Sequence, residues 1–367
     1  MTNPTVSPRR AMILAAGLGE RMRPLTLRRA KPALPLLNRP LVSEIARRLI
    51  GAGVDELVVN LHHRPETVRE ALKDSVPDRV KLIYSEESPR VLGTGGGVAR
   101  ARQFLEGAPF FLLNGDSLSS CDLASLVRAH RRSKALATLV ARPLKPGDPY
   151  RPLEADEDGR LWRIAGRPSS PLVPPRGLKQ YVFTGVHLIE PDLFEFFPSD
   201  GVFDINHDVY PAALAAGRRL FILSDESDWY EIGTPALYLA ASLHLLSGGG
   251  LADAAERSVE PGIFAAPGVK GLKSAQLEAP VWIGPDSILG VGARLHRCVI
   301  GPRCEMQEGA HVEDAVLMAG SRIGRGSRLR GVVTEDGVEV PPSTDLSSQV
   351  LVRENGRLAA YSLPPPA

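Results

Sequence analysis

The sequence predicts an α/β fold, in which a Rossmann-like, mostly parallel sheet with helices on both faces precedes a short left-handed parallel β-helix. Two observations carry this prediction. Segments typical of strands and helices alternate along the first two-thirds of the chain, and apolar residues recur at a spacing near six in the last third. The chain has 367 residues, more than one ordinary core holds, so we expect more than one domain.

The first part of the chain contains short apolar runs separated by segments with apolar residues on one side. We expect strands at 11–15, 56–61, 80–84, 110–113, 137–141 and 182–189. We expect helices at 40–52, 65–73, 98–105, 123–132 and 235–246. Such alternation predicts a mostly parallel sheet, and sheets of this kind bind ligands at the carboxyl ends of their strands.

The last third contains three consecutive blocks of seventeen residues, which begin at Ile283, Ile300 and Leu317. Each block has apolar residues at its first, seventh and thirteenth positions and ends in a valine. A helix does not explain this period. A chain that passes three flat sides per coil does, and the pattern is similar to the hexapeptide repeat of left-handed parallel β-helices. A β-sandwich with fortuitous spacing is the alternative, which nine matched positions disfavour.

A glycine run, Ser247 to Gly250, separates the two patterns. We therefore expect an α/β domain at 1–246, a linker at 247–262 and the β-helix at 263–345. Residues 346–367 would form a hairpin and tail, with Asn355-Gly356 at the turn.

Composition excludes several classes of protein. The net charge of +2 gives no field that points to nucleic acid or a membrane, and no apolar run approaches the length of a membrane span. The apolar run after the polar residues 1–10 is too brief for a signal peptide. Cys121, Cys298 and Cys304 form no disulfide framework. We expect a cytoplasmic protein without a nucleic-acid or membrane partner.

The first predicted strand leads into a loop with two glycines and two arginines, Gly17, Gly19, Arg21 and Arg23. Glycines allow backbone N–H groups to approach a phosphate, and guanidinium groups bind phosphate oxygens. A dinucleotide fingerprint needs a third glycine where Met22 stands, and the Gly-Lys-Ser/Thr of a P-loop is absent. Taken alone, the loop is either a phosphate loop or a structural turn with solvated arginines.

A longer pattern resembles a known family. Its residues run Leu14-Ala15-Ala16-Gly17-x-Gly19-x-Arg21-x-x-Pro24-Leu25-Thr26, with Lys31-Pro32 after them. This is similar to the signature of the nucleoside-diphosphate-sugar pyrophosphorylases, or sugar-1-phosphate nucleotidylyltransferases. The resemblance covers about residues 11–246, and long family members carry a left-handed β-helix after this catalytic domain. It implies an enzyme that joins an NTP to a sugar 1-phosphate and releases pyrophosphate.

The resemblance also implies roles for particular residues. Arg21 would hold the β- and γ-phosphates, and Lys31 would lie near the α-phosphate and the sugar phosphate. The expected nucleotide-binding residues are Leu14, Ala15, Ala16, Gly17, Gly19, Glu20, Gly93, Thr94, Gly95 and Gly96. The expected sugar-phosphate-binding residues are Arg167, Gly185 and Glu190. The second glycine segment, residues 93–97, has two interpretations from its residues alone. It is either a surface that a flat base approaches closely or a flexible loop.

Two carboxylates are candidate metal ligands. Asp116 stands where the buried strand 110–113 ends, and an acid in that position is a candidate ligand. The resemblance implies that Asp116 and Glu231 bind Mg²⁺, although Glu231 stands where the family has Asp. Asp116 as a plain turn residue and Glu231 as a solvated acid are the alternatives.

Departures from the family pattern leave other functions open. Glu231, the segment 165–167 and the pair Tyr150-Arg151 motivate the alternative of a catalytically weak regulatory homologue that binds a nucleotide sugar, which the retained Arg21, Lys31 and Asp116 disfavour. An acyltransferase activity of the β-helix would have only His296 and His311 as bases, so we interpret that domain as an oligomerisation or interdomain element and expect a homo-oligomer. Resemblance in the segment 60–67 and in the β-helix favours relatives that use GTP and mannose 1-phosphate, whereas resemblance in the run 94–97 favours uridylyl or heptose-type relatives.

Overall fold

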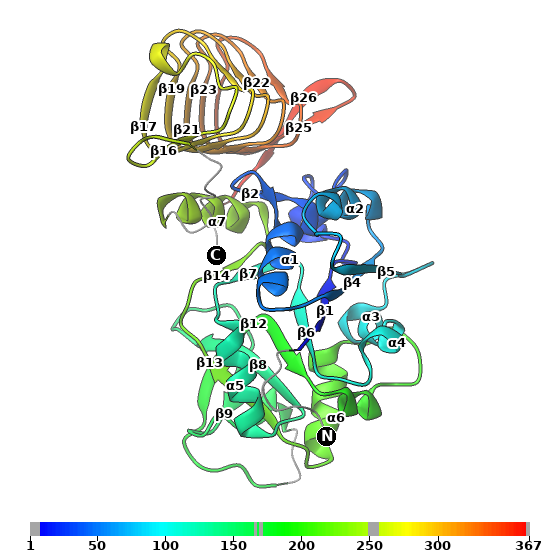
Figure 1. Cartoon of the computed structure of the whole chain (residues 1–367). Helices are drawn as coiled ribbons and strands as arrows, with labels where there is room; N and C mark the ends of the chain where they lie inside the picture. The colour runs from blue at the N-terminus through cyan, green and yellow to red at the C-terminus, as the bar shows by residue number, and fades with distance from the viewer. Residues whose placement is uncertain (1–7, 165–166, 169–171, 249–256, 365–367) are drawn as a thin grey trace. The chain divides into compact units, whose positions relative to one another are not determined.

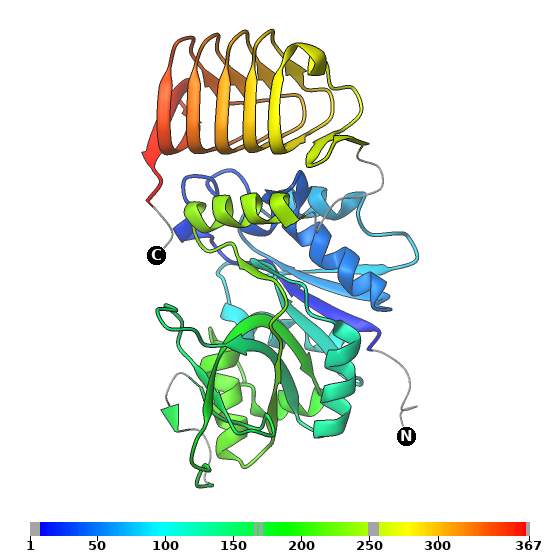
Figure 2. The same cartoon turned by 90° about the vertical axis from the view of Figure 1, so that its left-hand side faces the viewer.

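A computed structural model describes residues 8–164, 167–168, 172–248 and 257–364, without the side chains of residues 167, 168 and 257 (Figures 1 and 2). The chain divides into two compact units. The first consists of Met1–Leu18, Ala30–Ala33 and Leu41–Tyr230, and the second of Gly19–Arg29, Leu34–Pro40 and Glu231–Ala367. Each unit is described by itself.

The first unit is built on a mixed sheet, which has ten strands within the described residues. Four neighbouring strands are parallel: β6 (Phe110–Asn114), β1 (Arg10–Leu14), β4 (Glu56–Leu61) and β5 (Lys81–Glu86). Next to β6 runs the long antiparallel strand β12 (Lys179–Ile189), which also pairs with β8 (Ala137–Pro143). The sheet is completed by β13 (Leu220–Ser224), β9 (Leu153–Ala155), β10 (Leu161–Ile164) and β11 (Arg167–Pro168).

Helices cover both faces of this sheet (Figures 1 and 2). On one face lie α1 (Leu41–Gly51) and α5 (Leu123–Ser133); on the other lie α3 (Gly93–Arg100), α4 (Arg102–Leu105) and α6 (Tyr210–Ala215). The sequence sets the ends of α5 locally, because the Asp122 carboxylate accepts hydrogen bonds from the N–H groups of Ala124 and Ser125. Lys134 then ends the helix in the left-handed conformation.

The predicted elements of the first unit are present, including α2 (Pro65–Lys73). Two details differ from expectation. Strand β12 is antiparallel to its neighbours, so the sheet is mixed. The glycine run at residues 93–97 forms the first turns of α3, although glycine disfavours helices and the helix was expected to begin at Val98.

The second unit contains the predicted parallel β-helix, whose coils stack side by side in Figure 2. Strand pairing places Ile283 beside Ile300, and Ile300 beside Leu317, which confirms the repeat of seventeen residues. One hydrogen-bonded sheet consists of β15 (Arg257–Glu260), β16 (Ile263–Ala265), β17 (Gln276–Ile283), β19 (Arg294–Ile300), β21 (His311–Leu317), β23 (Arg328–Thr334), β25 (Asp345–Glu354) and β26 (Arg357–Ser362). A second sheet consists of β18 (Ile288–Leu289), β20 (Glu305–Met306), β22 (Arg322–Ile323) and β24 (Glu339–Val340).

The repeat continues beyond the three predicted blocks. A further block begins at Thr334, which is completely buried, and its strand β24 pairs with β22. The Thr334 hydroxyl lies 2.9 Å from the Met318 N–H, which donates to it, and 2.8 Å from the Ser321 hydroxyl. Because a polar residue occupies this inward position, a search for apolar residues misses the block. The expected hairpin follows, with Asn355 and Gly356 at positive φ in the turn.

Helix α7 (Pro235–Gly248) belongs to the second unit and packs on β17, β19, β21 and β23. The units therefore do not follow the predicted segments, since the loop Gly19–Arg29 and α7 group with the β-helix. Residues 249–256 of the predicted linker lie outside the described residues. Among the helices that the structure describes, none has the length and apolar character to cross a membrane.

Candidate functional site

The carboxyl end of β1 lies between two asparagines. Its last residue, Leu14, pairs with Asn60 of β4 and with Asn114 of β6. The Leu14 carbonyl accepts a hydrogen bond of 2.9 Å from the Gly115 N–H, and a Cβ at Gly115 would lie only 2.5 Å from that carbonyl oxygen. Glycine thus allows the segment after β6 to approach the start of the predicted phosphate loop, and Gly17 in that loop has open space around it.

Beside this strand end, Lys31 and Asp116 form an ion pair. Lys31 begins a short 3₁₀ helix (Lys31–Ala33), and its Nζ donates to Asp116 Oδ2 at 2.8 Å. The lysine side chain is 9% exposed, whereas the aspartate side chain is 40% exposed. The structure thus brings together a predicted catalytic lysine and a predicted metal ligand. The pair offers an ammonium group to a phosphate oxygen and an accessible carboxylate to a cation.

The predicted sugar-site residue Gly185 lies next to the neighbours of Asp116. A bulge between Phe183 and Val186 interrupts the pairing of β12 with β8, and Gly185 has a φ of +85° there. A Cβ at Gly185 would lie 2.7 Å from Ser117 Oγ. Glycine is therefore required by both the backbone conformation and the space.

The other two predicted sugar-site residues are not brought to this position. Glu190 follows the end of β12, where Ile189 pairs with Phe110, so it lies at the edge of the sheet where β1 begins. There its Oε1 contacts His130 Nε2 at 3.1 Å. The antiparallel strand runs across the sheet between Gly185 and Glu190, which separates the two residues. The side chain of Arg167 lies outside the described residues.

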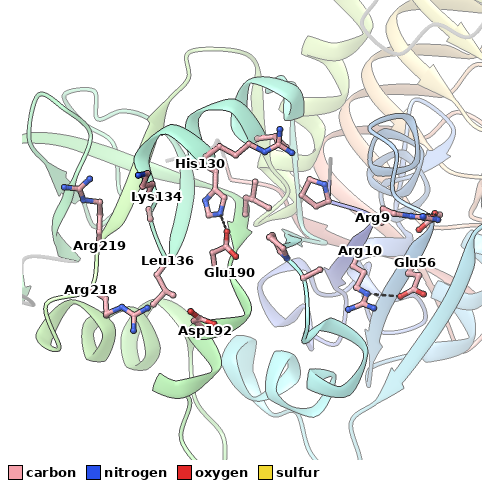
Figure 3. Close-up of a pocket in the computed structure, with 18 residues that line it drawn as sticks. Arg9, Arg10, Glu56, His130, Lys134, Leu136, Glu190, Asp192, Arg218 and Arg219 are labelled. Carbon is pink, nitrogen blue, oxygen red and sulfur yellow. Dashed lines mark hydrogen bonds and ion pairs between the residues drawn. The ribbon is translucent and has the colours of Figure 1, made fainter. Parts of the chain in front are cut away.

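A cavity of about 990 Å³ lies at that opposite edge, and Figure 3 shows the residues that line it. His130 and Glu190 form its centre, with Arg10 and Glu56 on one side and Arg219 on the other. It is lined by none of the predicted site residues apart from Glu190. Two of its cations, Arg9 and Arg10, are paired with Asp55 and Glu56. The cavity therefore does not belong to the predicted site.

The second glycine segment is packed against protein. A Cβ at Gly95 would lie 2.4 Å from the Phe203 ring, and one at Gly96 would lie 2.9 Å from Leu92 Cβ. Gly93 has a φ of +76° and faces the Phe203 carbonyl. The Thr94 hydroxyl donates to Asp204 at 2.7 Å, which fixes the start of α3. The glycines are thus explained by close internal packing in a helix, and the flexible-loop alternative is wrong.

Asn60 is a residue of this edge that the sequence analysis did not assign to the site. It is 2% exposed, and its Oδ1 accepts a hydrogen bond of 2.7 Å from the Ala15 N–H. The sequence feature that could have identified Asn60 is its place as a polar residue near the end of an otherwise apolar strand. A buried amide in such a position must satisfy its hydrogen bonds within the protein.

In the second unit, the arginine-bearing half of the phosphate loop contains another ion pair. The loop turns at Gly19, which has a φ of 63°, and the Thr26 hydroxyl closes it by donating to the Gly19 carbonyl at 2.7 Å. Arg21 Nη2 lies 3.5 Å from Glu231 Oε1. The arginine side chain is 68% exposed and the glutamate 18% exposed, so the guanidinium remains accessible to an anion. Glu20 pairs with Arg23 at the surface.

The same loop is anchored on the β-helix through residues that the sequence analysis did not single out. Arg28 donates from Nη1 to Glu335 Oε1 at 3.2 Å and from Nη2 to the Arg353 carbonyl at 2.8 Å. Arg29 forms a salt bridge with Asp336. No sequence signal connected these arginines to acids some three hundred residues later.

Buried and partly buried tyrosine and cysteine side chains do not offer an alternative catalytic set. Burial, with a smaller effect of Asp228, raises the pKa of Tyr230 to about 12. Burial also raises the pKa of the Cys121 thiol and that of Cys304, the latter to about 12, so both are poor nucleophiles at neutral pH. Among the described residues, no three His, Cys, Asp or Glu side chains cluster as ligands of one metal ion.

Comparison with known proteins identifies a family for each of the two parts of the chain. The profile of the nucleotidyl transferase family matches residues 10–248, and a GlmU-like, C-terminal hexapeptide profile matches residues 278–350. The UTP–glucose-1-phosphate uridylyltransferase of Synechocystis sp. is 29% identical over 347 residues, covering 87% of this chain and 85% of the relative. The mannose-1-phosphate guanylyltransferase of Mycobacterium tuberculosis is 28% identical, covering 90% and 80%. Mannose-1-phosphate guanylyltransferase 1 of Arabidopsis thaliana is 26% identical, covering 94% and 99%.

The first profile covers more than half of the chain, and its limits enclose the loop after β1, the Lys31–Asp116 pair and Glu231. The chain therefore belongs to the nucleotidyl transferase family.

Proposed function

We propose that this protein joins an NTP to a sugar 1-phosphate, giving a nucleoside-diphosphate sugar and pyrophosphate, and that the pair used is GTP with mannose 1-phosphate or a related sugar. The observation that carries the proposal is the Lys31–Asp116 ion pair at the carboxyl end of β1, beside a loop with open space at Gly17. Ligands of α/β sheets bind at this edge. Membership of the nucleotidyl transferase family supplies the class of reaction.

The proposed reaction requires positioned charge more than covalent help. An oxygen of the sugar phosphate attacks the α-phosphorus, and the bond to the bridging oxygen breaks, so that pyrophosphate leaves with the bonding electrons. Lys31 would hold the α-phosphate and the incoming phosphate, and Arg21 would stabilise the departing pyrophosphate. Fixed charges of this kind lower the barrier because they need not reorganise during the reaction.

We propose Mg²⁺ as the divalent ion. Asp116 and Glu231 are oxygen donors, which suit Mg²⁺, and both carboxylates retain some exposure. When bound, the ion would neutralise charge on phosphate oxygens. Without it, the ammonium of Lys31 and the guanidinium of Arg21 balance these two carboxylates, so that neither acid is left uncompensated.

The test is a screen for pyrophosphate release with the full chain, Mg²⁺, four NTPs and a panel of sugar 1-phosphates. We expect GTP with mannose 1-phosphate to give the fastest release. A preference for UTP and glucose 1-phosphate, the pair in the name of the Synechocystis relative, would correct the proposed substrates. Release with no combination would favour the regulatory homologue that binds a nucleotide sugar without turnover.

We further propose a cytoplasmic homo-oligomer. The expected oligomer rests on the β-helix, whose stacked coils offer a regular surface, and analytical ultracentrifugation tests it. A monomer at micromolar concentration would contradict this part of the proposal and leave the proposed reaction unaffected.

A further inference from the structure

Two buried polar side chains connect the segments that the proposed function assigns to the nucleotide. Asn60 lies in β4 and Glu87 directly follows β5, and each is 2% exposed. Asn60 accepts a hydrogen bond from the Ala15 N–H and donates one to Glu87 Oε1, each at 2.7 Å. The second carboxylate oxygen, Oε2, accepts from the Leu92 N–H at 2.7 Å. The chain of contacts runs from the phosphate loop to the start of α3.

The direction of every hydrogen bond between Ala15 and Leu92 is fixed by the two backbone groups at the ends of the series. Ala15 and Leu92 contribute backbone N–H groups, which can only donate. Asn60 must therefore turn its oxygen to Ala15 and its NH₂ group to Glu87. Both oxygens of Glu87 then accept, which requires a carboxylate at that position. An amide and an acid are each needed where they stand.

The pair also sets the position of α3. A Cβ at Gly97 would lie 2.6 Å from Glu87 Oε1 and 2.7 Å from Asn60 Nδ2, so the helix backbone rests on the pair. The backbone of Glu87 is fixed as well, since its N–H donates to the Leu61 carbonyl at 2.8 Å. The polar pair therefore determines how far Ala15 lies from the glycine segment of α3.

We propose that Glu87 is a positioning residue for nucleotide binding, which acts through Asn60 and the backbone N–H groups of Ala15 and Leu92 to hold the two nucleotide-binding segments at a fixed spacing. The inference rests on the proposed function and on the family resemblance, which assigns Ala15 and Gly93–Gly96 to the nucleotide. Charged hydrogen bonds between buried groups are strong and specific in geometry, so a change in one member shifts its neighbours.

The first test is Glu87→Gln. The introduced amide replaces one acceptor by a donor, which must face either the Leu92 N–H or the Asn60 NH₂ group. Either orientation breaks the chain of hydrogen bonds. We expect the dissociation constant of the preferred NTP, measured by isothermal titration calorimetry on the full chain, to rise about tenfold or more. In pyrophosphate release, the KM for the NTP should rise likewise, with kcat and the KM for the sugar phosphate within about twofold.

The decisive variant is the double substitution Asn60→Asp with Glu87→Gln, which exchanges the two functional groups. The introduced carboxylate accepts from the Ala15 N–H and from the introduced NH₂ group, whose oxygen accepts from the Leu92 N–H. We expect NTP affinity within about threefold of the original protein. Asn60→Asp alone places two carboxylates face to face and should bind the NTP at least as weakly as Glu87→Gln.

Several results would overturn the inference. One is a double variant that binds as weakly as Glu87→Gln, and another is Glu87→Gln with unchanged NTP affinity. Should Glu87→Gln fail to fold, the double variant and Asn60→Asp still give the comparison. Should the original protein bind NTPs without releasing pyrophosphate, the proposed function fails, while the dissociation constants still test the inference. Binding of none of the four NTPs would overturn both.

Discussion

At the scale of single residues, each predicted carboxylate of the site is balanced by a predicted cation. Asp116 contacts Lys31, and Glu231 contacts Arg21. Binding of a triphosphate would bring further negative charge to both cations, and a divalent ion would bring positive charge to both carboxylates. If the proposed roles hold, the two ion pairs would keep these side chains in place before the substrate and the ion bind.

Glu231 gives a direct test of metal binding, because the family has the shorter Asp at its position. We expect Asp116→Asn to abolish pyrophosphate release, Glu231→Asp to preserve or raise it, and Glu231→Gln to raise the Mg²⁺ concentration needed for half-maximal rate about tenfold or more. Mg²⁺ prefers charged oxygen ligands, so loss of one carboxylate weakens its binding. A Mg²⁺ titration of each variant provides the measurement. An unchanged titration for Glu231→Gln would leave Glu231 a surface acid.

His187 predicts how stability depends on pH. It is completely buried, and burial lowers its pKa from 6.5 to about 3. Below pH 6.5 the unfolded chain takes up a proton that the folded chain does not, so stability falls as the pH falls toward 3. At pH 5 the loss is about 2 kcal/mol.

His187→Gln should flatten this dependence, since glutamine does not titrate. Urea unfolding of the original protein and of His187→Gln at pH 7.5, 6 and 5 measures it. Equal slopes for the original protein and His187→Gln would show that another group causes the dependence. The His187 ring also contacts the Tyr210 hydroxyl at 2.6 Å, so some loss of stability at every pH is expected.

The sequence was sufficient to select Lys31 and Asp116 as candidate site residues, because both stand at positions that resemble the pattern of the family. It did not show that the two form an ion pair, since 85 residues separate them along the chain. Glu190 illustrates the opposite limit. It follows Gly185 closely in sequence, yet an extended strand carries it to the other edge of the sheet.

At the scale of elements, the loop that carries Arg21 is held by the far end of the β-helix. Glu335 is 8% exposed and accepts hydrogen bonds from the Arg28 guanidinium and from the Arg353 N–H. These contacts fix the backbone at the end of the loop, and Arg29 adds a second attachment at Asp336. The loop conformation is thus determined partly by residues outside the α/β fold.

Glu335→Ala should therefore lower kcat/KM for the NTP about tenfold, which is roughly 1.4 kcal/mol. The substitution removes the acceptor for Arg28, so the loop samples more conformations and Arg21 is less often in position. The matched control is Glu339→Ala, an exposed glutamate of a nearby strand that pairs only with Arg322 among the described residues. Circular dichroism of both variants should match the original protein. Equal rates for the two variants would remove the β-helix from loop positioning.

The elements themselves were largely predictable. The period of seventeen located the coils because each inward position is completely surrounded by protein and selects an apolar side chain. It failed at Thr334, where hydrogen bonds to Met318 and Ser321 replace apolar packing. In the first unit, the sequence did not indicate that Gly93 to Gly97 would be helical. Glycine has a low helix propensity, and close packing against Phe203, Asn60 and Glu87 overrides it.

At the scale of the whole molecule, the two compact units do not have the same limits as the match to the nucleotidyl transferase family. The nucleotidyl transferase profile ends at residue 248, whereas the compact unit that contains the β-helix includes Gly19–Arg29, Leu34–Pro40 and α7. Within that unit, Asn38 Nδ2 donates to the Ile300 carbonyl at 2.9 Å, and the Tyr238 hydroxyl of α7 donates to the Pro35 carbonyl at 2.5 Å. Segments from the start of the chain are thus built into the second unit.

A fragment that ends at residue 248 should consequently be impaired, although it contains every residue of the nucleotidyl transferase profile. Truncation at residue 248 removes the β-helix, so Arg28 and Arg29 lose their partners Glu335 and Asp336. It also exposes the face of α7 that packs on β17, β19, β21 and β23. Exposed apolar surface favours aggregation, and loss of the loop anchors disturbs Arg21.

We expect the fragment to release pyrophosphate at less than about a tenth of the original rate, on the scale of the loss expected for Glu335→Ala. Size-exclusion chromatography and thermal unfolding would show whether it also associates and melts earlier. A monomeric fragment with the original rate and melting temperature would establish the α/β part as self-sufficient and limit the β-helix to the assembly of the oligomer.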